Sequence, residues 1–160
     1  MLKTVKRRSQ KQEKSVAKDF NAKVTVASGA LWGMKADVRN DKFLIECKTT
    51  EKDYYSLTAK VWEKIEQEAI RDHLRIPLMV IDVKDKDRVI VFRPQDFGEE
   101  THSHCDFSDL PKSVRIRSDM FIKGSSFMYV HHICGKKHNV ICLMLQKDFE
   151  EKYKEVLFNE

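Results

Sequence analysis

The stretch "ADVRNDKFLIECKTT", residues 36–50, combines the pattern of a sheet hairpin with charged residues that strands ordinarily avoid. Two segments, 35–39 and 42–48, are separated by Asn40 and Asp41, a pair that tolerates the positive φ angles of a tight two-residue turn. The residues just before Glu46 are strongly apolar, as in a buried strand. The sequence therefore predicts two paired strands that carry acidic side chains into a largely buried setting.

The period of two along a strand decides which of these charged side chains share a face. With a two-residue turn at this place, Asp37 lies opposite Leu44. Glu46 is then the diagonal neighbour of Asp37, at about 7–8 Å between backbones, and Lys48 follows on the same face. The opposite face takes the apolar residues Phe43, Ile45 and Cys47.

Two carboxylates at this separation can bind one divalent cation. Mg²⁺ prefers hard oxygen ligands and often keeps several waters when bound by carboxylates. Lys48 would lie beside such a water and the phosphate that it attacks, and Glu13 on a preceding helix could lend a third carboxylate. The pattern predicts metal-assisted hydrolysis of a phosphodiester. The alternative is a surface hairpin whose charges are solvated; the apolar residues before Glu46 and the flanking helices favour the metal site.

The rest of the chain alternates helical and strand patterns. We expect a helix over 9–22, capped by Ser9, and a second over 56–73. Continuous apolar runs at 76–83 and 88–93 predict buried strands. Beyond residue 98 the sequence predicts further strands in "SVRIRS", "SFMYVHHI" and "NVICLML", and a closing amphipathic helix in "QKDFEEKYKEVLF". The expected class is α/β, with a mixed sheet.

Length and composition limit the protein to a few classes. At 160 residues, 41% of them hydrophobic, the chain is large enough to form one domain with its own core. No apolar run approaches the roughly 20 residues of a membrane span, and the basic N-terminus lacks the apolar stretch of a secretory signal. We expect a cytoplasmic protein without membrane association. The 4 cysteines show no dense disulfide spacing, which favours reduced thiols.

Positive charge gathers at the start of the chain. The net charge is +5, and basic residues crowd positions 3–14, whereas acidic residues lie mostly in later segments. A basic arm of this kind favours a polyanionic partner, with nucleic acid as the expected one. We therefore expect DNA contacts from Arg7, Arg8 and Lys11. The alternative is a solvated tail that aids solubility.

Taken together, these motifs resemble the PD-(D/E)XK nuclease superfamily, and most specifically the archaeal-type Holliday junction resolvases and their phage relatives. The matching features are Glu13 on the first helix, "ASGA" at 27–30, Asp37 after the loop and "IECK" at 45–48. The helix and strand pair that follow also fit, so the resemblance covers roughly residues 9–97. Ala36 replaces the proline of the motif, which we expect to change loop stiffness more than chemistry.

The resemblance implies a restriction-endonuclease-like α-β-β-β-α-β core, dependence on Mg²⁺ or Mn²⁺, and a homodimer that acts on branched double-stranded DNA. Asp37 and Glu46 would be metal ligands, together with the main-chain carbonyl of Cys47. Lys48 would orient the attacking water or stabilise charge, and Glu13 would complete the acidic cluster. Ser28, in the loop, would approach the DNA. Residues 98–160 form an extension of the same single domain that has no counterpart in the minimal resolvase.

Residues around the acidic pair mix aromatic and basic character, which suits base stacking and phosphate binding. The expected DNA contacts are Trp32, Lys35, Arg39, Lys52, Tyr54, Lys60, Arg115 and Arg117. The last two belong to "KSVRIRS", whose alternation places them on one face of a strand. The alternatives are structural: aromatic side chains packed under the loop, and basic side chains that are simply solvated.

The histidine and cysteine residues of the C-terminal third raise a zinc alternative. The candidate ligands are Cys134, His138 and Cys142, with His102, His104 or Cys105. Paired C-x₂-C spacing, which zinc sites usually show, is absent, so we favour apolar cysteines and surface histidines.

Resolution of four-way DNA junctions is thus the first functional hypothesis, with a place in DNA recombination or repair. A nuclease that cuts flaps, ends or linear duplex is an alternative within the same class. A non-catalytic nucleic-acid-binding module with a vestigial acidic cluster is an alternative from another class.

Overall fold

The structure is a computed structural model that describes residues 2–25, 36–84, 88–100, 113–121, 126–133 and 137–158. The helices are α1 (Leu2–Asp19), α2 (Ala59–Arg71), α3 (Gln146–Lys152) and α4 (Lys154–Phe158), with short 3₁₀ helices η1 (Pro94–Phe97) and η3 (Ser118–Met120). The strands are β1 (Lys23–Val24), β2 (Val38–Arg39), β3 (Phe43–Thr50), β4 (Tyr55–Thr58), β5 (Ile76–Val83), β6 (Arg88–Phe92), β7 (Ser113–Ile116), β8 (Ser126–Ile133) and β9 (Lys137–Leu145).

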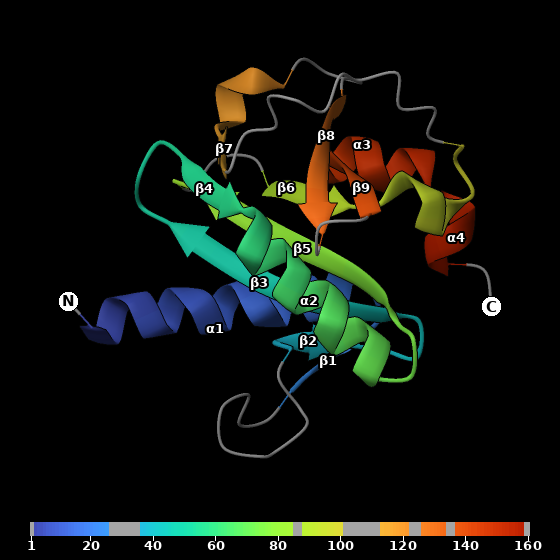
Figure 1. Ribbon diagram of the computed structural model, residues 1–160. Coiled ribbons are helices and arrows are strands. Elements are labelled where there is room, and N and C mark those ends of the chain that lie inside the picture. The colour runs from blue at the N-terminus through green and yellow to red at the C-terminus, as the bar shows by residue number, and fades with distance from the viewer. Residues whose placement is uncertain are drawn as a thin grey trace.

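A mixed sheet organises the described part of the chain (Figure 1). Its strand order is β1-β2-β3-β5-β6-β9-β8. The strands β3 and β5 are parallel and α2 lies between them in sequence, whereas the other neighbouring strands pair antiparallel. A parallel pair needs such a crossover, because its strands run in the same direction. The predicted α/β class with a mixed sheet is confirmed.

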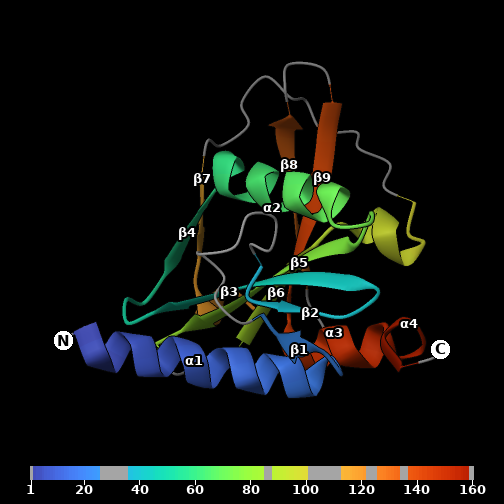
Figure 2. The same ribbon diagram turned by 90° about the horizontal axis from the view of Figure 1, so that it is seen from below.

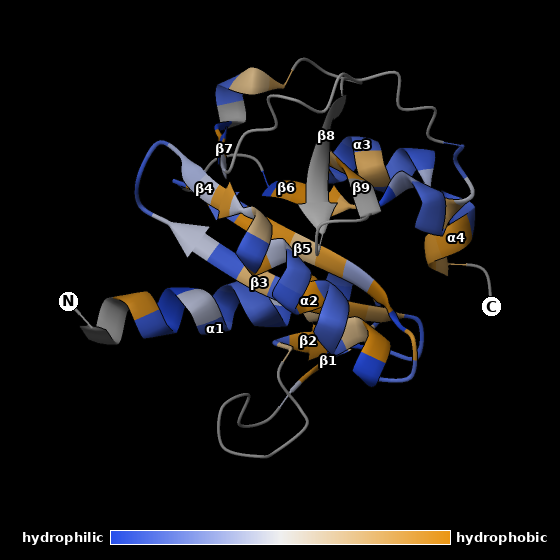
Figure 3. Cartoon of the chain, in the orientation of Figure 1, coloured by the Kyte–Doolittle hydropathy of each residue, from blue (hydrophilic) through white to orange (hydrophobic). Residues whose placement is uncertain are grey.

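Helices cover both faces of this sheet, so the central strands are buried on both sides. Figure 2 shows α1 and α3 along one face and α2 across the other. The central strand β5 is largely hydrophobic, as Figure 3 shows. This explains why "IPLMVIDV" is a continuous apolar run: a strand covered on both faces has no solvent side to keep polar.

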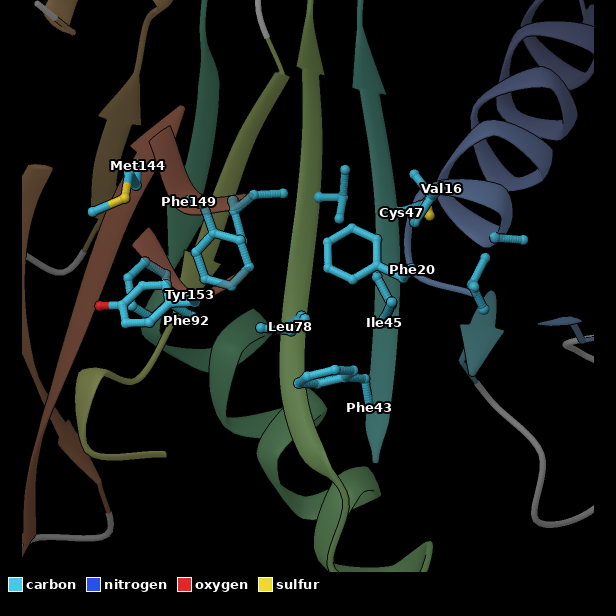
Figure 4. Packing of buried hydrophobic residues seen from close by; sticks show 14 of the residues in the cluster. Val16, Phe20, Phe43, Ile45, Cys47, Leu78, Phe92, Met144, Phe149 and Tyr153 are labelled. Carbon is cyan, nitrogen blue, oxygen red and sulfur yellow. The ribbon is translucent and has the colours of Figure 1, made fainter. Parts of the chain in front are cut away.

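The α1 face of the sheet is filled by one apolar cluster (Figure 4). Val16 and Phe20 of α1 pack against the alternate residues Phe43, Ile45 and Cys47 of β3. The i, i+4 spacing of the two helix residues puts them on one stripe, as the sequence predicted. The predicted inward face of β3 is therefore confirmed.

The first helix is longer than the sequence predicted. It begins at Leu2, so the basic arm is helical, and Ser9 is an interior residue whose hydroxyl donates to Oε1 of Glu13 at 2.9 Å. The predicted cap at Ser9 is wrong. The helix ends at Asp19 because Asn21 adopts a left-handed φ of 46°, which an α-helix does not accept.

The second helix is shorter than predicted, because residues 55–58 form the strand β4. Thr58 caps the helix: its backbone is extended and its hydroxyl accepts from the N–H of Val61 at 3.4 Å. The expected helix 56–73 is therefore corrected to 59–71. The strand β4 pairs with β7 in a separate two-stranded sheet, which we call the β4–β7 ribbon.

An arginine network ties the sheet to the helices on its α1 face. The guanidinium of Arg88 donates to both carboxylate oxygens of Asp82, at 2.6 and 3.3 Å, and to Asp19 of α1 at 2.9 Å. It also donates to Gln146 at the start of α3, at 3.2 Å. A planar guanidinium can satisfy several acceptors at once, which suits this junction of four elements.

The C-terminal segment completes the same core. The predicted strand 139–145 is part of β9, which pairs with β6 in the main sheet, and α3 follows directly. Phe149 and Tyr153 join an aromatic group with Phe92 and Phe97, with ring centroids 4.9 Å apart for Phe92–Phe149 and 4.6 Å for Phe97–Tyr153. The expected single closing helix is interrupted at Tyr153, giving α3 and α4. None of the described helices is long and apolar enough to cross a bilayer.

Removing one ring from this aromatic group tests whether the extension stabilises the whole fold. Phe149 is fully buried, so Phe149→Ala should lower the free energy of unfolding by about 3–5 kcal/mol. Phe158→Ala, at a half-exposed ring of α4, should change it by no more than about 0.5 kcal/mol. Urea unfolding followed by circular dichroism measures the free energy of unfolding of both variants. Equally small changes in the two would show that α3 contributes little to the core.

Candidate active site

The hairpin that carries the acidic residues turns one residue later than predicted. Arg39 lies opposite Leu44, and the N–H of Asn40 donates to the carbonyl of Phe43 at 3.1 Å, so Asp41 and Lys42 form the turn. The predicted turn at Asn40 and Asp41 is therefore wrong, and the strand pairing is displaced by two residues.

The side chain of Asn40 explains this turn. Its Oδ1 accepts hydrogen bonds from the N–H groups of Lys42, at 3.0 Å, and Phe43, at 2.7 Å. Its Nδ2 donates to the carbonyl of Phe20, just beyond α1, at 2.9 Å. An asparagine that bonds the backbone two residues later closes a turn that begins at itself. Asn40 therefore precedes the turn and is not one of its two central residues.

A displacement of two residues keeps every side chain on its predicted face. Continuing the observed register by one step places Asp37 directly opposite Glu46, where the sequence had predicted a diagonal pair. Directly opposite residues of antiparallel strands have Cβ atoms about 4.5–5.5 Å apart. The two acidic residues are thus closer neighbours than the sequence indicated.

The carboxylate of Asp37 is fixed by the backbone of β3. Its Oδ2 accepts a hydrogen bond from the N–H of Cys47 at 2.9 Å. Burial, and then the negative charge of Glu46, raise the pKa of Asp37 from 3.8 to about 6, against the opposing effects of that N–H and of Lys48. Such a shift marks a site where a second positive charge would be strongly favourable.

Lys48 is held against the other acid of the pair. Its Nζ donates to Oε1 of Glu46 at 2.5 Å, and both side chains are partly buried. Burial alone would lower the pKa of Lys48, but the hydrogen bond and charge of Glu46 outweigh it and raise that pKa. The amine is therefore protonated and remains beside the carboxylates, as the sequence predicted for this face of β3.

The backbone N–H and carbonyl of Cys47 leave β3 on the side where Asp37 lies. Within a strand, the N–H and carbonyl of one residue leave on the same side, and successive residues alternate. Since the N–H of Cys47 meets Asp37, its carbonyl also leaves β3 on the β2 side. That direction fits the carbonyl ligand implied by the resemblance. The thiol itself is buried in the apolar cluster, and burial raises its pKa.

Glu13 lies near the pair without joining it. Its negative charge is the smallest of the influences that raise the pKa of Asp37. Among the described residues, no three Asp, Glu, His or Cys side chains converge as a preformed cation site would. The structure thus brings Asp37, Glu46 and Lys48 together and leaves Glu13, which receives a hydrogen bond from Ser9, at the border of the site.

This donor set fits Mg²⁺. The ion is usually bound through one or two carboxylates, with waters and substrate phosphates completing its octahedral shell. Asp37 and Glu46 provide two hard oxygen donors in a partly buried position. The pKa of Asp37 is raised, and a bound cation would lower it again. The carbonyl of Cys47 is the third donor that these residues could offer.

Two residues near the site, Gln12 and Tyr55, were not predicted from the sequence. Gln12 is buried, and its Nε2 donates to the carbonyls of Lys48, at 2.9 Å, and Val80, at 3.3 Å, so it ties α1 to the strand that carries the acids. The signal was its position four residues before Val16, in the apolar stripe of the helix. Burial raises the pKa of Tyr55, which is half-buried on β4, and Lys48 lies close enough to oppose that rise.

The predicted DNA contacts fall into three groups. Ser28, Trp32 and Lys35 lie outside the described residues. Ion pairs engage a second group: Arg8 with Glu51 at 3.7 Å, Arg39 with Asp72 at 3.4 Å, and Arg117 with Asp119. The exposed or half-exposed side chains of the third group are Arg7, Lys11, Lys52, Tyr54, Lys60 and Arg115.

The structure describes the side chain of only one of the candidate zinc ligands. Cys142 is buried in the apolar cluster of the α1 face, as expected for an apolar cysteine. The side chains of the other candidates, His102, His104, Cys105, Cys134 and His138, lie outside what the structure describes.

Comparison with known proteins finds little sequence similarity. No family model matches the chain, and no curated protein matches it. Among solved structures, it is similar to Hjc, a Holliday junction resolvase from the archaeal hyperthermophile Archaeoglobus fulgidus. The two share 16% sequence identity with a TM-score of 0.43, over 67% of this chain and 85% of the other.

The raised pKa of Asp37 predicts a pH-dependent gain in stability on removing its charge. The folded carboxyl keeps its proton up to about pH 6 and the unfolded one releases it near 3.8, so stability falls as the pH rises through this window. Allowing for solvent screening, Asp37→Asn should raise the free energy of unfolding by about 1–2 kcal/mol at pH 7.5, and by little at pH 4.

Denaturant unfolding at the two pH values measures this difference. Asp41→Asn, at an exposed aspartate of the same hairpin, is the control and should show no such pH-dependent gain. A loss of stability in Asp37→Asn at pH 7.5 would contradict the electrostatic account of the pair.

Proposed function

We propose that the protein is a Mg²⁺-dependent endodeoxyribonuclease of the PD-(D/E)XK superfamily, with Mn²⁺ as a substitute. Its substrates are branched double-stranded DNAs, four-way junctions first, and it acts as a homodimer that presents one site to each of two strands. The observation that carries the proposal is the bond of the Asp37 carboxylate to the N–H of Cys47 beside the ion pair of Glu46 with Lys48, on a strand packed against helices on both faces.

Each residue of the site has a role that follows from its surroundings. The bound cation would polarise the phosphate and lower the pKa of a water. Asp37 is oriented for ligation by its bond to the N–H of Cys47, and Glu46 approaches from the facing strand. Lys48, protonated and partly buried, stabilises the charge that develops on the phosphate. Glu13 adds negative charge at the border of the site.

Positive charge on the neighbouring helix supports a polyanionic substrate. Exposed Arg7 and Lys11 lie on α1, which is tied to the strand of the site through Gln12. The ion pair of Arg8 with Glu51 links the same helix to the turn after β3. A polyanion bound by these cations would have an affinity that depends steeply on salt.

Neutral replacements in the pair should stop cleavage and spare binding. Asp37→Asn or Glu46→Gln should reduce the rate of junction cleavage in Mg²⁺ by at least about a hundred- to a thousandfold, because each removes a ligand of the cation that would stabilise the transition state. Single-turnover assays on a labelled four-way junction measure the rate, and anisotropy measures binding. Asp41→Asn and Glu155→Gln, at exposed positions, are the matched controls. Cleavage at the parental rate in both site variants would refute the assignment.

A substrate panel tests the proposed preference. A four-way junction, a flap and a linear duplex with the same arm sequences should be cut in that order, with the junction fastest. Preferential cutting of the flap or duplex would retain the nuclease chemistry and reject junction resolution. Binding to all three without cleavage in Mg²⁺ or Mn²⁺ would indicate a binding module.

A further inference from the structure

The β4–β7 ribbon has one buried and one exposed face. Leu57 pairs with Val114, and both are buried against α2 and the sheet. The exposed face carries Ser56 opposite Arg115. Because β7 belongs to the segment after residue 98, the extension brings a basic residue to a strand that begins five residues after the end of β3.

Two cations, Lys52 just before β4 and Arg115 on β7, share one aromatic ring. The guanidinium of Arg115 lies 5.1 Å from the ring centroid of Tyr54, and Nζ of Lys52 lies 5.9 Å from it. Both distances are within the range of a cation–π interaction, which holds a cation in place without neutralising it. The ring therefore favours positions of both positive charges close to its face.

These two cations differ from their neighbours in having no acidic partner within the described residues. Around them, acids neutralise the nearby cations: Asp119 pairs with Arg117, and Asp53 pairs with Lys84 at 2.6 Å. Lys52 and Arg115 instead keep their full charge at an exposed surface. A paired, oriented and uncompensated set of donors suits an anion, and a guanidinium suits a phosphate in particular because it binds two oxygens at once.

The ribbon lies close to the acidic pair. Lys52 follows Lys48 by four residues, so their Cα atoms are at most about 14 Å apart. At a rise of about 3.4 Å per nucleotide, that is a span of about four nucleotides. A strand bound at the acidic pair would therefore reach the two cations within a few phosphates.

We propose that Lys52, Tyr54 and Arg115 form a phosphate clamp that binds the DNA backbone about four nucleotides or fewer from the scissile bond. This rests on the proposed function and assigns to the extension a part in substrate binding. The clamp binds phosphate without reading base sequence, so its loss weakens binding to all DNA sequences about equally.

The clamp is tested by binding in the full-length Asp37→Asn protein, which separates binding from cleavage. The probe is a fluorescein-labelled four-way junction, and anisotropy is measured between 50 and 200 mM NaCl. Adding Arg115→Ala should weaken binding about tenfold and reduce the slope of log affinity against log salt by about one. Lys147→Ala, which removes an exposed charge on α3, should change neither quantity.

Variants of Tyr54 test its positioning role. Tyr54→Leu should weaken binding severalfold and Tyr54→Phe should restore it, because phenylalanine keeps the ring face that holds the cations. Arg115→Lys, which keeps the charge but not the two-point contact, should fall between the parent and Arg115→Ala.

The outcomes separate the clamp from the nuclease proposal. If the parent binds the junction and Arg115→Ala leaves both affinity and salt slope unchanged, the clamp is wrong and the nuclease proposal stands. If Tyr54→Leu weakens binding as strongly as Arg115→Ala, and 2-aminopurine in the probe shows base stacking, the ribbon binds a base and the phosphate clamp is wrong. If the parent protein binds no DNA at any salt concentration, both proposals fail.

Discussion

The hydrogen bond from the N–H of Cys47 to the carboxylate of Asp37 is the constraint on which the proposed site depends. It fixes one acid at the edge of β3 while the strand register brings Glu46 opposite. Burial, and then the negative charge of Glu46, make the charged form of Asp37 costly, and the pKa of Asp37 is raised accordingly. The strand β3 that carries the pair packs into apolar clusters on both of its faces, which holds its backbone in place.

The arrangement of charges on one face of β3 could be predicted from the sequence because a strand has a period of two. Displacing the strand pairing by two residues leaves each side chain on the same face. Asp37, Glu46 and Lys48 therefore share a face in both the predicted and the observed pairing. The register itself could not be predicted. It depends on the side chain of Asn40, which closes the turn one residue later and also bonds to the end of α1.

Elements that depend on distant partners were the hardest to predict. Residues 56–58 fit the start of a helix by periodicity, and they belong to the strand β4 because β7, more than fifty residues later, pairs with them. Gln12 was treated as an ordinary helix residue, although it bonds to the backbone of two sheet strands. Local pattern indicates which face a residue takes, but a partner remote in sequence decides whether a segment pairs as a strand.

Anomalous diffraction from crystals soaked in Mn²⁺ would show whether Asp37 and Glu46 hold a cation. We expect a single strong manganese peak within coordination distance of a carboxylate oxygen of Asp37, a carboxylate oxygen of Glu46 and the carbonyl oxygen of Cys47, and no such peak in Asp37→Asn crystals. A soaked crystal without a peak between the two acids, or with the peak unchanged in Asp37→Asn, would contradict this expectation.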